Sequence, residues 1–247
     1  MRPAARFWAE KFSPQARATQ IEGHEVRRQL RKWFETWGLP KAIRVDHGDP
    51  WATRSDIPSA LALWLVGLGV KLLLNRPRVS TDNGIVERDH GVLAKWVEAH
   101  KAPHRQALQE QLDWAIDMQR ERYPAIQGQS RAQAFPDLRR NPRHYSQAQE
   151  AQLWQMQRVD DFISPFLWTR RVDKVGRVSL FSTAYSVGRA HAGHDVTIHF
   201  DIPTREWVIE NEQGQVLIRH LSQEITPDRI LNLNLAKRAN LVSHGSS

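Results

Sequence analysis

The spacing of apolar residues changes once along this chain of 247 residues, near Pro165, and the change limits the folds that it can adopt. Downstream, short runs such as DVTIHFD and EWVIE alternate apolar with polar residues and are separated by turn-forming segments such as NEQG. Alternation with period 2 is typical of half-buried strands. Five or six such strands in so short a segment predict a small barrel or sandwich, and we expect an all-β barrel over residues 166–222.

Upstream of Pro165 the apolar residues follow helical spacing instead. The first stripe consists of Val26, Leu30, Trp33, Phe34 and Trp37, at i, i+4, i+7, i+8 and i+11, and Gly38 and Pro40 then stop the helix. The expected helices cover residues 21–37, 57–68, 83–100 and 103–122, and short apolar runs at 41–45 and 70–74 are expected to be strands. Alternation of strands with helices predicts an α/β layer architecture for residues 1–122.

Two further segments have the composition of connecting or terminal chain. Residues 123–165 are rich in Pro, Gln, Arg and Asn, and are expected to form a basic linker with one short helix. Residues 223–247 form a tail that we expect to be partly disordered.

The chain is strongly basic, with a net charge of +8 and a pI near 10.2, and its basic residues are spread along its whole length. This charge predicts a polyanionic partner, DNA first. The absence of Cys excludes disulfides and Cys-containing zinc sites. The longest apolar stretch, residues 60–74, is interrupted by Gly67, Gly69 and Lys71, so no membrane association is expected. We expect a cytoplasmic, nucleoid-associated protein.

Two carboxylates occupy positions suited to metal chemistry. Asp46 follows the expected strand at 41–45, and Glu87 lies in the first turn of the helix that opens near Asn83. Carboxylate oxygens are preferred ligands of Mg²⁺ and Mn²⁺, and a pair of such ions can catalyse phosphodiester chemistry. Arg88 and Lys95 on the same helix could reach a phosphate. A turn Asp and a first-turn Glu favoured by the helix dipole are the simpler interpretations.

The two acidic segments resemble those of retroviral-type integrases and bacterial insertion-sequence transposases. GLPKAIRVDHG at 38–48 is similar to the segment that carries the second acid of their Asp-Asp-Glu triad, and NGIVER at 83–88 to the segment with the third. The resemblance implies an RNase H-like core, Asp46 and Glu87 as ligands of Mg²⁺ or Mn²⁺, and DNA integration. Residues 123–145 and Val187-Gly188-Arg189 extend it into the linker and the barrel. Implied partners are DNA and either further copies of the chain or a full-length recombinase.

One departure from the family pattern affects the expected activity. The first triad Asp lies on the first strand of the core, yet no Asp occurs among the 45 residues that precede Asp46. We therefore expect an incomplete RNase H-like core, as in a fragment, a decayed element or a split protein, with impaired strand transfer. The alternatives are a non-catalytic DNA-binding or assembly subunit derived from such a recombinase and, third, a different RNase H-like nuclease.

Other candidate residues have simpler interpretations. Asp82 fits a helix cap better than a triad acid, and the pair His191 and His194 lacks further metal ligands nearby in sequence. Five basic residues of the expected barrel could contact a DNA backbone, namely Arg170, Arg171, Lys174, Arg177 and Arg189. Because the same segment carries six acidic residues, protein contact is the alternative.

Overall fold

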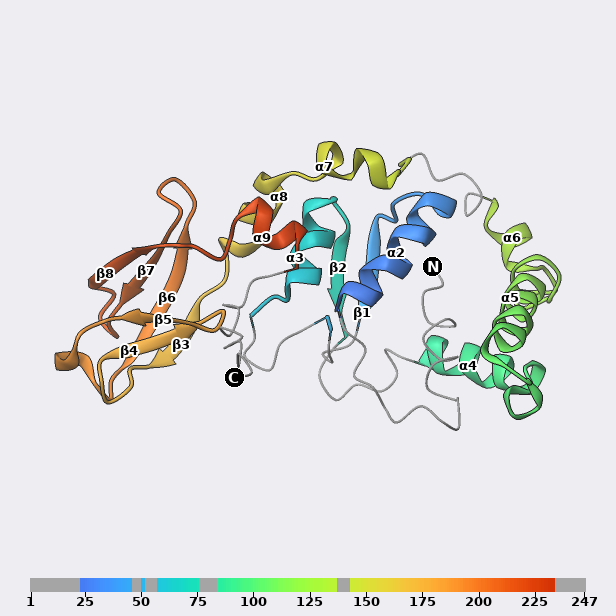
Figure 1. Ribbon diagram of the computed structural model, residues 1–247, viewed down its shortest axis with the longest axis horizontal. Helices are drawn as coiled ribbons and strands as arrows, with labels where there is room; N and C mark the ends of the chain where they lie inside the picture. The colour runs from blue at the N-terminus through green and yellow to red at the C-terminus, as the bar shows by residue number, and fades with distance from the viewer. Residues whose placement is uncertain (1–22, 46–49, 52–56, 76–83, 137–142, 234–247) are drawn as a thin grey trace, which may run out of the picture. The chain divides into compact units, whose positions relative to one another are not determined.

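The computed structural model describes residues 23–45, 50–51, 57–75, 84–136 and 143–233, and the chain has a mixed α/β fold (Figure 1). It divides into two compact units. Unit 1 comprises residues 1–47 and 72–150, and unit 2 comprises residues 48–71 and 151–247. The four predicted segments stay a prediction, but this grouping differs from them because residues 48–71 belong with the C-terminal half.

The described part of unit 1 begins with a helix, and two short strands pair beside it. Helix α2 (Gly23–Trp37) buries Val26, Leu30 and Phe34 of the predicted stripe, whereas its last member, Trp37, is 41% exposed. The N–H of Gly38, at φ 73°, then donates to Phe34 O at 2.7 Å and ends the helix. Strands β1 (Ala42–Val45) and β2 (Lys71–Leu74) pair with each other, so both predicted strands are confirmed.

A helical hairpin forms a second part of unit 1. It consists of α4 (Gly84–Trp96), the 3₁₀ turn η2 (Ala99–Lys101) and α5 (Arg105–Glu121). The two long helices enclose an apolar cluster of Leu93, Val97, Leu108, Leu112 and Ala115. The first helix ends earlier than expected, because the chain tightens into the 3₁₀ turn before the second helix.

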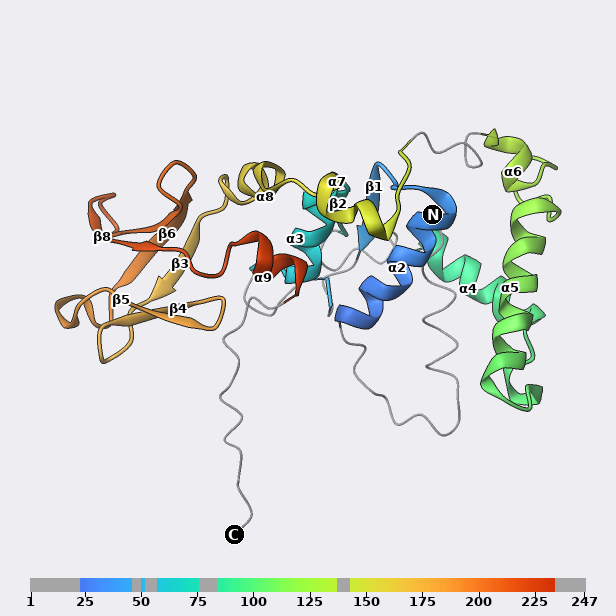
Figure 2. The same cartoon turned by 45° about the horizontal axis from the view of Figure 1, so that its top comes forward.

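Part of the expected linker is ordered and packs on unit 1. Helix α6 (Arg131–Ala134) contacts α5, as Figure 2 shows, and begins with a capping box formed by Ser130 and Gln133. Arg143 donates from Nη1 to Pro40 O at 2.8 Å, and Leu39 N–H donates to Arg143 O. Sequence composition did not reveal the two contacts of Arg143, since they join residues about a hundred positions apart.

The described residues of unit 2 include three helices and part of a fourth. They are α3 (Ala60–Gly67), α8 (Met156–Ile163), α9 (Pro227–Leu231) and the end of α7 (Glu150–Leu153), which follows η4 (Gln147–Gln149). Helix α3 is buried from Leu61 to Gly67 and contacts both α8 and α9. Its N-cap is Ser59, whose hydroxyl accepts from Ala62 N–H, so the helix begins three residues later than expected.

Six strands of unit 2 correspond closely to the predicted period-2 runs. They are β3 (Trp168–Arg171), β4 (Arg177–Leu180), β5 (Thr183–Ser186), β6 (Asp195–Asp201), β7 (Glu206–Glu210) and β8 (Val216–Leu221). All pairings are antiparallel, and one side of β4, β5 and β6 is buried at every second residue.

The predicted barrel is not closed among the described strands, and this part of the prediction is corrected. Strands β3, β6, β7 and β8 form one sheet in that order, whereas β4 and β5 form a separate hairpin (Figure 1). At the open side, the His220 ring of β8 reaches Ser186 O of β5 with Nε2 at 2.6 Å. Side-chain alternation predicts strands, but turn and 3₁₀ segments such as η5 (Arg189–His191) decide which edges meet.

The first part of the tail that we expect to be partly disordered, residues 223–233, is folded against the rest of unit 2. Ile225 and Ile230 are fully buried, and Thr226 caps α9. Glu224 is also buried and accepts hydrogen bonds from Tyr185 Oη at 2.5 Å and Trp207 Nε1 at 3.4 Å. Burial and the bond to Glu224 raise the pKa of the Tyr185 hydroxyl, so it stays a donor. Residues 234–247 lie outside the described residues.

Candidate carboxylate site and nucleic-acid interface

The structure places one of the two predicted carboxylates. Glu87 lies in the first turn of α4, and its side chain is exposed to solvent. Asp46 lies outside the described residues, directly after the buried Val45 at which β1 ends. Whether Asp46 approaches Glu87 therefore stays a prediction. His47, Asp49, Asp82 and Asn83 also lie outside the described part of the chain.

The predicted basic residues near Glu87 are on α4 and exposed. Arg88 is adjacent to Glu87, and Lys95 is in the last turn of the helix. At a rise of 1.5 Å per residue, Lys95 lies about 12 Å along the axis from Glu87. Arg88 and Lys95 are separated by about 10 Å along the axis, so they could contact neighbouring phosphates of one polymer.

Within the described residues, no group of three or more His, Cys, Asp or Glu side chains is arranged to hold a metal ion. The pair His191 and His194 accordingly gains no third ligand there. The exposed carboxylate of Glu87 offers oxygen atoms of the kind that coordinate a hydrated Mg²⁺. A metal at Asp46 and Glu87 stays a prediction, since Asp46 is not described.

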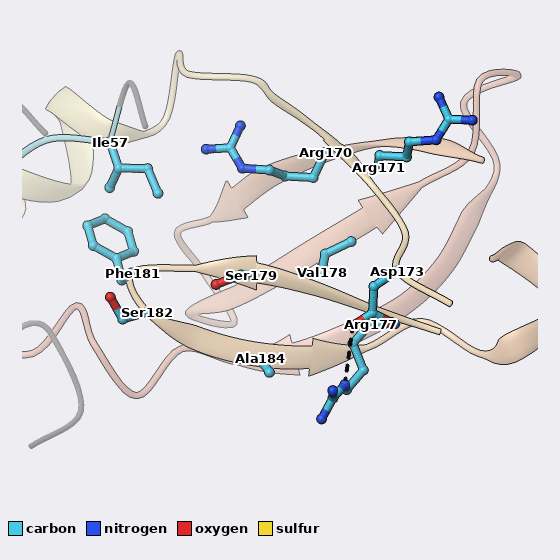
Figure 3. Close-up of a pocket in the computed structure, with 10 residues that line it drawn as sticks. All are labelled: Ile57, Arg170, Arg171, Asp173, Arg177, Val178, Ser179, Phe181, Ser182 and Ala184. Atoms are coloured by element: carbon cyan, nitrogen blue, oxygen red, sulfur yellow. Dashed lines mark hydrogen bonds and ion pairs between the residues drawn. The ribbon is translucent and has the colours of Figure 1, made fainter. Parts of the chain in front are cut away.

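An arginine-lined groove in unit 2 contains several of the basic residues predicted to meet DNA. Its volume is about 590 Å³. The groove is lined by Arg170 and Arg171 of β3, by Asp173, by Arg177, Val178 and Ser179 of β4, and by Ile57, Phe181, Ser182 and Ala184. Figure 3 shows Arg170 directed toward Ile57, whereas Arg171 extends the other way along the strand. We call this feature the arginine groove.

The described residues that line the arginine groove are positive on balance. Three of them are arginines and one, Asp173, is an acid. Asp173 accepts the backbone N–H groups of Arg177 at 2.8 Å and Val175 at 3.0 Å, and these bonds hold its pKa below the usual value. It therefore stays ionised near neutral pH and offsets part of the charge of Arg177, whose Nε lies 3.5 Å away (Figure 3).

The tight turn between β4 and β5 forms one end of the arginine groove. Phe181 and Ser182 have φ of 48° and 60°, a conformation that residues with a side chain rarely adopt. The Phe181 ring is buried, with its centroid 5.8 Å from that of Trp207. This packing offsets the backbone cost and fixes an apolar surface next to the arginines.

Sequence reasoning missed a buried polar cluster in unit 1. Arg31 of α2 donates to Glu150 from Nε at 2.8 Å and from Nη2 at 2.6 Å, and Tyr145 Oη donates to the same carboxylate. The bonds to Glu150 raise the pKa of Arg31, and burial raises that of Tyr145. No local pattern could reveal this cluster, because Arg31 and Glu150 are 119 positions apart.

No helix in the described part of the chain has the length and apolar character required to cross a bilayer. In a search for related families, no family model matches the chain. The resemblance to integrases and transposases therefore stays a prediction from the sequence.

Proposed function

We propose that this chain is an integrase- or transposase-like protein of a mobile element, with an incomplete RNase H-like core. One observation carries the proposal: the two motif carboxylates follow a strand end and open a helix. Val45 ends β1 directly before Asp46, and Glu87 lies exposed in the first turn of α4. These are the places at which the integrase-like motifs require their acids, and an open α/β sheet binds ligands at such strand ends.

The proposed chemistry is phosphoryl transfer assisted by Mg²⁺ or Mn²⁺. The metal ions, when bound, activate the attacking oxygen and stabilise the leaving one. Asp46 and Glu87 would hold them, while Arg88 and Lys95 would position the DNA backbone. Without the first Asp of the triad, the metal pair lacks one ligand, so the reaction is expected to be impaired in the chain as given.

The first prediction concerns strand transfer. The purified chain, incubated with Mg²⁺ or Mn²⁺ and labelled DNA ends from a candidate element, should yield no strand-transfer product above background. Glu87→Gln, which removes the charge at nearly constant size, should then change nothing. Robust product from the original chain that is lost on Glu87→Gln would show that the site is complete and would overturn the expected impairment.

The arginine groove favours a second candidate function, a non-catalytic DNA-binding or assembly subunit derived from such a recombinase. Its three arginines line a concave surface of about 590 Å³. Arg side chains bind phosphate oxygens with paired N–H donors. Such contacts do not read base sequence, so this candidate predicts binding that depends on salt more than on sequence.

The second prediction tests DNA binding by the arginine groove. Arg170→Gln/Arg171→Gln should weaken duplex binding and lower the slope of log K against log salt by about 1.8, because each phosphate contact contributes about 0.9. The measurement is fluorescence anisotropy over a salt series with two unrelated duplexes. Arg219→Gln, on edge strand β8 and paired with Asp201 and Glu206, is the matched control. An unchanged slope in the double variant would exclude the groove as a DNA contact.

A further inference from the structure

Helix α5 has two faces of different character. Leu108, Leu112, Ala115 and Gln119 are buried on one face. At 100° per residue, Glu110, Trp114, Asp117 and Glu121 lie together on the opposite face. The solvent-facing side of an amphipathic helix usually carries charged and polar residues, so the Trp on this face suggests that the face contacts another molecule.

The exposed face carries an aromatic patch. The side chain of Trp114 is 54% exposed, and that of Tyr123, just beyond the helix, is 41% exposed. Trp96 of α4 lies between them, with its ring centroid 6.4 Å from that of Trp114 and 5.1 Å from that of Tyr123. These contacts hold the rings in place, which lowers the entropy lost on binding. We call Trp96, Trp114, Tyr123 and the acids of this face the α5 surface.

The charge of the α5 surface opposes that of the whole chain. Helix α5 has four carboxylates and two arginines, a net charge of −2, whereas the chain carries +8. One of the arginines, Arg120, pairs with Asp117 at 3.2 Å and Glu121 at 2.5 Å. The surface therefore repels DNA, and two such surfaces repel each other. Its complement is a basic protein surface that can receive an indole ring.

The arginine groove has these properties. Its arginines match the acids in sign, and the buried Ile57, Val178 and Phe181 give it apolar walls. Its volume of about 590 Å³ is large enough for an indole side chain. Aromatic anchors that enter desolvated pockets contribute most to protein association, and flanking charges determine specificity.

We propose that this chain associates with a second copy of itself head to tail, the α5 surface of one copy docking in the arginine groove of the next. The indole of Trp114 enters the groove, and Glu110 and Asp117 face Arg170 and Arg171 of the other copy. The contact is heterologous, since it joins two different surfaces, and an open dimer as a whole keeps one unused α5 surface and one unused arginine groove unless a ring closes. The proposal does not depend on the proposed strand-transfer chemistry, but it uses the groove of the second candidate function, so DNA and the α5 surface of another copy would compete for this groove.

The third prediction tests this association without DNA. Sedimentation velocity over a concentration series at low ionic strength should show dimers and larger species of the original chain, which dissociate at high salt because exposed charges are then screened. Trp114→Ala should raise the dissociation constant at least about tenfold. Phe135→Ala, which removes a side chain that is 53% exposed elsewhere in unit 1, should not. A chain that stays monomeric at low salt, or an equal effect of both variants, overturns the proposal.

A mixing experiment separates a head-to-tail contact from a symmetric one. Trp114→Ala/Asp117→Lys disables the α5 surface, and Arg170→Glu/Arg171→Glu disables the arginine groove. Each double variant should be monomeric alone, but an equimolar mixture should form a heterodimer through the one intact pair of surfaces. Circular dichroism melting of each variant confirms folding. A mixture of folded variants that remains monomeric contradicts the proposal, whereas a structural effect of the substitutions could not produce the heterodimer.

Discussion

Replacing Glu150 with alanine is expected to lower the free energy of unfolding by about 3–5 kcal/mol, because it leaves the guanidinium of Arg31 partly buried without its counter-ion. Arg31 holds Glu150 with two N–H donors, and the side chains are only 20% and 7% exposed. Tyr145 Oη donates to the same carboxylate and would lose its acceptor. The residual exposure of Arg31 favours the lower end of this range.

Chemical denaturation followed by circular dichroism measures this change. Glu25→Ala is the matched control, because Glu25 pairs with Arg28 within the same helix at an exposed site. Such a pair contributes about 0.3–0.5 kcal/mol. Arg31→Met/Glu150→Leu should cost less than Glu150→Ala alone, because no buried charge remains unpaired. A loss below about 1 kcal/mol for Glu150→Ala would show that the cluster does not hold residues 143–150 on α2.

Periodicity predicted the regular elements because their burial patterns are local. The stripe of Val26, Leu30 and Phe34 identified α2. Alternation of apolar with polar residues identified strands such as β4 and β6, and their burial alternates in the same way. Each pattern repeats within a few residues, so neighbouring positions report on one face. The same reasoning applied to α5 would have marked Trp114, which lies opposite the stripe of Leu108 and Leu112.

Contacts between distant segments could not be predicted in this way. The short helix α9 is ordered because Ile230 is buried and α9 packs on α3, which is far away in sequence. Arg205 supports the segment that precedes α9. It donates to Ile225 O at 2.7 Å and also binds Asp160. Composition alone predicted a partly disordered tail without showing which part folds, because a few apolar residues among polar ones do not reveal a distant partner.

The candidate sites show the same difference between local patterns, which the sequence reveals, and contacts between distant segments, which it does not. The motif around Glu87 predicted its place in the first turn of α4, since helix-start signals are local. Arginines along the β segment were recognisable individually, but their convergence with Ile57 in one groove depends on how β3 and the β4–β5 hairpin meet. Asp46 remains a prediction from its motif.

Gly176→Ala is expected to destabilise the β strands of unit 2 by about 2–5 kcal/mol. Gly176 has φ of 84°, which costs a residue with a side chain about 1–2 kcal/mol. A Cβ there would also lie 2.5 Å from the carbonyl carbon of Gly188 and 2.6 Å from the nitrogen of Arg189. Both neighbours are backbone atoms, and relieving such overlap costs about 1–3 kcal/mol more.

Gly214→Ala is the control that separates these two costs. Gly214 has φ of 76°, close to that of Gly176, but a Cβ there meets nothing within 4 Å. Gly214→Ala should therefore lower the free energy of unfolding only by the cost of the positive φ, about 1–2 kcal/mol. Guanidinium unfolding of both variants yields the difference, which measures the clash. Equal losses would mean that the β3–β4 turn shifts freely. A larger loss for Gly176→Ala means that the turn is fixed where Gly176 O accepts the N–H groups of Val187 and Gly188, which also fixes Arg177 in the arginine groove.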